Sequence, residues 1–78
     1  MANRAIGAVL RGLREERGLS QEQLGFKAGL HRTYVSQLER GLKSPSLKTL
    51  DKIAKVLRTK TSELVALAEQ GKFKTSSH

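Results

Sequence analysis

A very short connection between two helical segments is the feature that most restricts how this chain can fold. Ser20 is a good N-cap for the first segment, Gln23 lies three residues later as in a capping box, and Gly29 ends the segment. The second segment runs from about residue 32 to residue 40 and ends at Gly41. Two short helices joined by so few residues must cross steeply, so the sequence predicts a helix-turn-helix arrangement.

Three further segments show helical spacing of apolar residues, and the chain has no alternating strand pattern. The apolar positions are Ile6, Val9, Leu10 and Leu13 in the first helix, Leu47, Leu50, Ile53, Ala54 and Leu57 in the fourth, and Leu64, Leu67 and Ala68 in the fifth. Gly18 should end the first helix, Ser46 should cap the fourth after Pro45, and the fifth should begin after Thr61. The predicted fold is all-α, a compact five-helix bundle that contains the helix-turn-helix.

Two glycines lie inside the first predicted helix. Gly7 and Gly12 weaken it by about 1 kcal/mol each relative to alanine. Residues this small can permit a second helix to pack closely.

The domain organisation follows from chain length and from the composition of the C-terminus. A chain of 78 residues suits one domain with a modest core, which we place at residues 1–70. Residues 71–78 follow the last helix and hold one apolar residue, so they are predicted to be a flexible basic tail.

Several classes of function are disfavoured by what the sequence lacks. It has no cysteine, and His31 and His78 lack metal-ligand spacing, so no metal site is expected. No Gly-rich phosphate loop, carboxylate cluster or nucleophile–base arrangement is present, so we expect neither an enzyme nor a cofactor or small-molecule ligand. No apolar run approaches the ~20 residues that span a bilayer, and a signal peptide is missing, so a cytoplasmic protein is expected.

The charge balance instead favours a polyanionic partner. Fifteen Lys and Arg residues stand against seven Asp and Glu, a formal net charge of +8. Nucleic acid is the usual partner of so basic a short chain, although such charge can also serve solubility alone. Aromatic residues for base stacking are scarce, which favours duplex DNA over single-stranded RNA.

The residues around the turn strengthen the helix-turn-helix interpretation. Gly25 is small where the two helices approach, Gly29 can adopt a positive φ, and Val35 can pack back between them. Leu24, Leu30 and Leu38 occupy the other inward positions.

Residues 7–68 resemble the Cro/CI-type, or XRE-like, helix-turn-helix regulators and phage repressors. The residues that carry the resemblance are RGLREERGLSQEQLGFKAGLHRTYVSQLERGLKSPSLKTLDKIAKVL. Within that family, HRTYVSQLERGLKSPS is most similar to the controller proteins of restriction–modification systems. The resemblance implies a lambda-repressor-like fold and a DNA-binding transcriptional regulator.

The polar face of the third helix is predicted to read bases. Arg32, Thr33, Ser36, Gln37 and Arg40 fall within one arc of roughly 140° on an ideal helix. An arginine fork can bond guanine O6 and N7, and a glutamine can both donate to and accept from adenine. The resemblance assigns Arg32, Thr33, Ser36 and Gln37 to base reading.

Phosphate contacts are expected around that face. Gln21 begins the second helix, and the resemblance assigns its position to the DNA backbone, sometimes with a second role in supporting the base readers. Tyr34 can either direct its hydroxyl to a phosphate or pack at the rim of the core. The remaining phosphate candidates are Lys43, Ser44 and Ser46 in the loop after the third helix, with Lys27 and Arg40 as weaker ones.

Glu39 lies at the inward edge of the same helix, where an unpaired charge is costly. The resemblance places Arg14 of the first helix against it. We therefore predict an Arg14–Glu39 ion pair that fixes the first helix to the third.

The fifth helix is the predicted dimer surface. Leu64 and Leu67 should face the core and leave Val65, Ala66 and Ala68 available, so all five are interface candidates. A dimer would read a palindromic operator. The favoured function is a controller protein that activates transcription, represses it or does both, with double-stranded DNA, a second copy and RNA polymerase as candidate partners. The alternatives are a phage-type repressor and an antitoxin-like module whose main partner is a protein.

Overall fold

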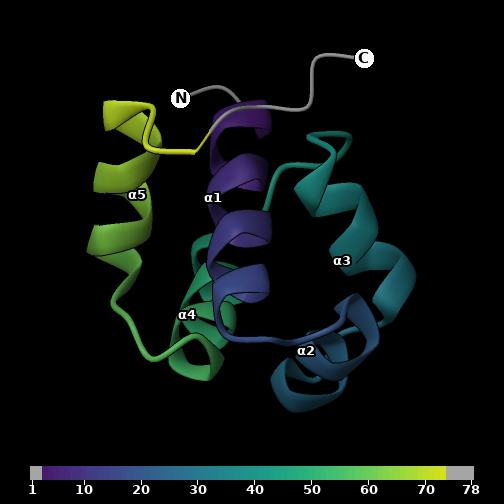
Figure 1. Ribbon diagram of the computed structural model, residues 1–78. Helices are drawn as coiled ribbons and strands as arrows, with labels where there is room; N and C mark the ends of the chain where they lie inside the picture. The colour runs from purple at the N-terminus through teal and green to yellow at the C-terminus, as the bar shows by residue number, and fades with distance from the viewer. Residues whose placement is uncertain (1–2, 74–78) are drawn as a thin grey trace.

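The computed structural model describes residues 3–73, and this part of the chain consists of five helices joined by short loops (Figure 1). The helices are α1 (Asn3–Glu16), α2 (Gln21–Ala28), α3 (Arg32–Glu39), α4 (Leu47–Val56) and α5 (Thr61–Gln70). Helix α1 lies between α5 and α3 in Figure 1, and it packs against both of them. Helices α2 and α4 lie toward the lower end in the figure, where α2 packs against α3 and α4. The all-α fold predicted from the sequence is confirmed.

The core forms where the apolar stripes of the helices meet. The largest side chains with less than 2% exposure come from all five helices or their ends: Val9, Leu10, Leu24, Val35, Leu38, Ile53, Leu57 and Leu64. Full burial of such a side chain contributes about 1.5–3 kcal/mol. Leu47 is an exception, because it begins α4 and is 69% exposed.

The helix ends follow the local signals in the sequence. Ser20 Oγ accepts a hydrogen bond from the Gln23 N–H at 3.0 Å, and Gln23 Oε1 accepts one from the Ser20 N–H at 2.8 Å. Gly29 ends α2 with a φ of 72°, in the left-handed region that favours glycine. The predicted capping box and glycine stop are therefore both present.

Two helix boundaries and the availability of Ala68 also differ from the sequence-based predictions. Helix α3 ends at Glu39 with Arg40 as its C-cap, and α5 begins at Thr61 itself. Ala68 is buried at 7% exposure, as the apolar spacing of the fifth helix predicts, and the prediction that it is available for a partner is wrong. It lies one turn beyond the fully buried Leu64, on the side that packs into the core.

Phe73 also differs, because it packs against the core cluster although it belongs to the predicted tail. Its ring covers Gly12, and a Cβ at position 12 would collide with it. A single apolar residue after a helix cap can thus extend the fold beyond the last helix. Residues 74–78 of the predicted tail lie outside the described residues.

Candidate nucleic-acid interface

The crossing of α2 and α3 depends on a close backbone approach at Gly25. The Leu30 N–H donates a hydrogen bond to the Gly25 carbonyl at 2.7 Å. A Cβ at position 25 would lie only 2.5 Å from the Leu30 carbonyl oxygen. Val35 of α3 is 1% exposed and belongs to the same core cluster as Leu24 and Ala28 of α2. The tight turn thus directs the polar face of α3 away from the core.

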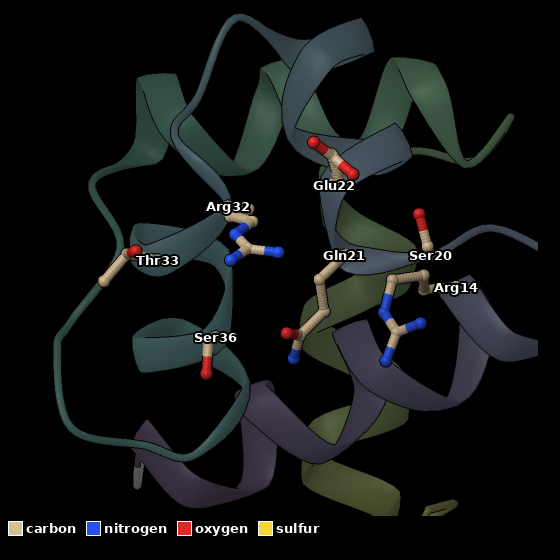
Figure 2. Close-up of a pocket in the computed structure, with 7 residues that line it drawn as sticks. All are labelled: Arg14, Ser20, Gln21, Glu22, Arg32, Thr33 and Ser36. Carbon is tan, nitrogen blue, oxygen red and sulfur yellow. The ribbon is translucent and has the colours of Figure 1, made fainter.

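An open hollow of about 520 Å³ lies between the start of α2 and the polar face of α3. Three predicted base readers, Arg32, Thr33 and Ser36, line it together with Gln21, a predicted phosphate contact. Its other lining residues are Arg14, Ser20 and Glu22. Figure 2 shows the Arg32 guanidinium and the Gln21 amide extending into the space between the two helices.

The fourth predicted base reader, Gln37, lies outside this hollow, as do the remaining predicted phosphate contacts. Gln37 is half-buried on α3, and Tyr34 is half-buried and packs against the core cluster. The exposed candidates are Lys27, Arg40, Lys43, Ser44 and Ser46. Ser46 Oγ caps α4 by accepting from the Thr49 N–H at 3.1 Å. The hydroxyl of Ser46 therefore has a structural role in the free protein.

A buried ion pair adjoins the hollow, because Arg14 is one of the lining residues. Arg14 Nε donates to Glu39 Oε2 at 2.6 Å, and Arg14 Nη2 donates to Glu39 Oε1 at 3.0 Å. The side chains of Arg14 and Glu39 are only 10% and 2% exposed. Arg14 Nη1 also donates to the Leu19 carbonyl at 2.7 Å, which ties the pair to the loop before α2. The structure thus contains the ion pair that the sequence predicts between α1 and α3.

This pair removes an electrostatic obstacle to binding a polyanion. The hydrogen bond to Glu39 raises the pKa of Arg14 above its ordinary value, although burial acts in the opposite direction. The guanidinium is therefore permanently charged and neutralises the carboxylate of Glu39.

Gln21 has a contact that the sequence alone did not predict. Its Nε2 donates to Glu39 Oε1 at 3.0 Å, so the carboxylate holds the amide in a defined orientation. The two residues are 18 positions apart, and only the crossing of α2 and α3 brings them together. The resemblance to known regulators, which allows a supporting role at this position, was the only available signal.

His31 has a structural role that reasoning about metal ligands missed. It is the N-cap of α3, and its Nδ1 accepts a hydrogen bond from the Thr33 N–H at 3.1 Å. Histidine is not among the usual N-cap residues, so composition gave no indication of this cap.

Within residues 3–73, no cluster of potential metal ligands occurs, and none of the helices is long and apolar enough to cross a membrane.

Comparison with known proteins agrees with this geometry. A helix-turn-helix family model matches residues 10–64, which includes both crossing helices. This chain belongs to the helix-turn-helix family. The resemblance predicted from the sequence is confirmed, and the chain is a DNA-binding transcriptional regulator rather than a member of an enzyme family.

Individual relatives include restriction–modification controllers and a phage repressor. The chain is 44% identical to control protein C.SmaI of Serratia marcescens over 62 residues. The aligned region covers 80% of this chain and 71% of C.SmaI. The crystal structure of the restriction–modification controller protein C.AhdI from Aeromonas hydrophila matches with a TM-score of 0.78 and 44% identity, covering 80% of this chain and 94% of that one. The immunity repressor of Bacillus phage phi105 is 40% identical over 60 residues, or 77% of this chain and 42% of the repressor.

Proposed function

We propose that this helix-turn-helix protein binds a palindromic operator as a homodimer and controls the genes of a restriction–modification system. The observation that carries the base-reading part is the open hollow, into which Arg32 and Gln21 extend, with the Gln21 amide bonded to a neutralised Glu39. The similarity to C.SmaI and C.AhdI supports the controller role.

Arg32 is the main proposed base reader. It is the first residue of α3 and is exposed, and no ion pair involving it is recorded among residues 3–73. The first turn of a recognition helix is where side chains meet base edges in the major groove. A free guanidinium there can donate two hydrogen bonds to one guanine.

Replacing Arg32 with alanine should relax discrimination at one base pair of each half-site. The expected loss is about 1–3 kcal/mol at that position, because the guanine edge loses both donors. Competition binding measures the discrimination, with a set of duplexes in which each operator position carries each of the four bases in turn. Lys43→Ala is the matched control, and it should weaken binding equally for all sequences and lower the salt dependence. Unchanged base preference in Arg32→Ala would remove Arg32 from the base readers.

Helix α5 is the proposed dimer surface. Leu64 and Ala68 of this helix are buried in the core and are therefore excluded from the interface. The proposed interface consists of the half-buried Val65, Ala66 and Leu67. A small domain gains stability when such apolar surface is covered by a second copy. A dimer also sets the two recognition helices about 34 Å apart, or a multiple of that distance, on the same side of the DNA.

Replacing Val65 with aspartate should therefore convert the dimer to a monomer and abolish tight operator binding, because a carboxylate would be buried at the interface. Sedimentation equilibrium measures the oligomeric state. The control is Lys27→Asp on α2, where the residue is exposed, and this variant should remain dimeric. A dimeric Val65→Asp protein would exclude this part of α5 as the interface.

Selection of bound duplexes from a randomised pool, at fixed salt and competitor concentration, tests the function as a whole. An enriched palindrome upstream of a restriction gene is the expected result. Enrichment of a site within a prophage control region would instead favour a phage-type repressor, the alternative that the relative from phage phi105 supports. Salt-sensitive binding without enrichment would contradict sequence-specific reading and favour the antitoxin-like alternative. Adding RNA polymerase to the enriched site tests that candidate partner.

A further inference from the structure

We infer that His31 is a positioning residue for base reading, because its neutral imidazole caps α3 and holds Arg32 and Thr33 on the DNA face. This inference rests on the proposed base-reading role of those two residues. The cap forms only when the imidazole of His31 is neutral.

The geometry of the cap defines the tautomer. His31 has extended backbone angles, φ −73° and ψ 143°, as an N-cap residue requires. Its Nδ1 accepts from the Thr33 N–H, so Nδ1 carries no proton and the ring proton is on Nε2. The bond satisfies one of the backbone donors that every helix leaves unpaired at its start.

Protonation of the imidazole would remove the hydrogen bond of the cap and add an unfavourable charge. An imidazolium carries a proton on each nitrogen and has no acceptor left for the Thr33 N–H. Its positive charge would also lie at the positive end of the α3 dipole. Asparagine, serine and threonine are the common caps and keep their acceptor at every pH, so histidine makes this cap dependent on proton concentration.

Within residues 3–73, the His31 side chain makes one hydrogen bond, with the Thr33 N–H, and no ion pair. The charged or titratable side chains on the two crossing helices are Arg32, Tyr34 and Glu39 on α3 and Glu22 and Lys27 on α2, and Glu39 is paired with Arg14 of α1. Within residues 3–73, no recorded hydrogen bond or ion pair joins any of them to His31. His31 is exposed, so solvent protons have access to the ring.

Loss of the cap should weaken specific binding more than nonspecific binding. Arg32 and Thr33 are the first two residues of α3, and a frayed first turn must order again before Arg32 can reach a base. Apparent affinity falls with the fraction of molecules in the competent conformation. When His31 is protonated, we expect operator binding to be weaker than with the neutral imidazole by roughly three- to tenfold per recognition helix. Binding to a scrambled duplex, which depends on phosphate contacts, should change far less.

The test compares three forms of the full chain in a His78→Gln background, which removes the only other histidine. These are the parent, His31→Asn and His31→Ala. Fluorescence anisotropy gives the Kd for the selected operator and for a scrambled duplex at fixed ionic strength, and circular dichroism verifies folding. The parent should lose operator affinity as the pH falls. His31→Asn should bind with the parent's affinity at pH 8 and keep it at pH 5.5, and His31→Ala should bind weakly throughout.

Two results would overturn the inference while leaving the proposed function intact. One is operator binding by the parent that stays constant or tightens at low pH; tightening would indicate a direct contact between the imidazolium and a phosphate. The other is the same pH dependence in His31→Asn, which retains a cap even if His31→Ala does not fold. If no variant prefers the operator over the scrambled duplex at any pH, both the proposed function and the inference fail.

Discussion

Replacing Glu39 with alanine should lower the free energy of unfolding by about 3–5 kcal/mol, because it leaves the buried charge of Arg14 without its partner. Two of the three recorded hydrogen bonds of the Arg14 side chain go to Glu39, and the carboxylate is 2% exposed. The same substitution frees the Gln21 amide. A loss of this size is a large fraction of the stability of a small domain.

A double-mutant cycle with Arg14→Ala, measured by urea denaturation, checks this expectation. The coupling energy should be several-fold larger than that of the Arg11–Glu15 pair on α1, whose side chains are each 55% exposed. Exposed pairs typically contribute about 0–1 kcal/mol. Equal coupling in the two pairs would contradict the role assigned to burial. Replacing both Arg14 and Glu39 with leucine should recover part of the stability, because no charge then remains buried.

Replacing Gly7 with alanine should destabilise the protein by about 2–3 kcal/mol, although alanine is the better helix former. Gly7 lies where α1 meets the end of α3, and an added Cβ would collide with the carbonyl oxygens of Leu38 and Glu39. Because these are backbone atoms, the collision can be relieved only if α1 and α3 move apart. That movement would also disturb the Arg14–Glu39 pair.

Gly12→Ala in the same helix is the matched control. The three atoms nearest to an added Cβ there all belong to the ring of Phe73, a side chain that can turn away. The gain in helix propensity of about 1 kcal/mol offsets much of the lost packing, so stability should stay within about 1 kcal/mol of the parent. Thermal and urea denaturation of both variants give the comparison. Similar stability for the two variants would show that the close approach of α1 and α3 at Gly7 does not exclude a Cβ.

The features predicted correctly from the sequence are mainly those controlled by neighbouring residues. The capping box at Ser20 and the left-handed Gly29 depend on backbone groups within four residues, so the pattern contains the whole cause. The apolar spacing of α1 likewise determined which face is buried. The Arg14–Glu39 pair spans 25 residues and was predicted only because the chain resembles a known family.

The candidate site could be predicted in part. Arg32, Thr33 and Ser36 share a face by helical geometry alone, and the structure brings them into one hollow with Gln21. The bond from Gln21 to Glu39 and the position of Gln37 outside the hollow depend on the crossing of α2 and α3. Periodicity gives the direction of a side chain around its own helix but no information on the distance to another helix.

The sequence by itself determined the number of helices, nearly all of their ends and the polar face of α3, because these depend on local propensity, capping and periodicity. Only the tertiary structure decided that Phe73 covers Gly12 and that Gln21 is held by Glu39. Burial and long-range hydrogen bonds depend on how closely separate helices approach. That approach is decided by packing of the whole core, in which close contacts at positions such as Gly7 and Gly25 exclude other arrangements.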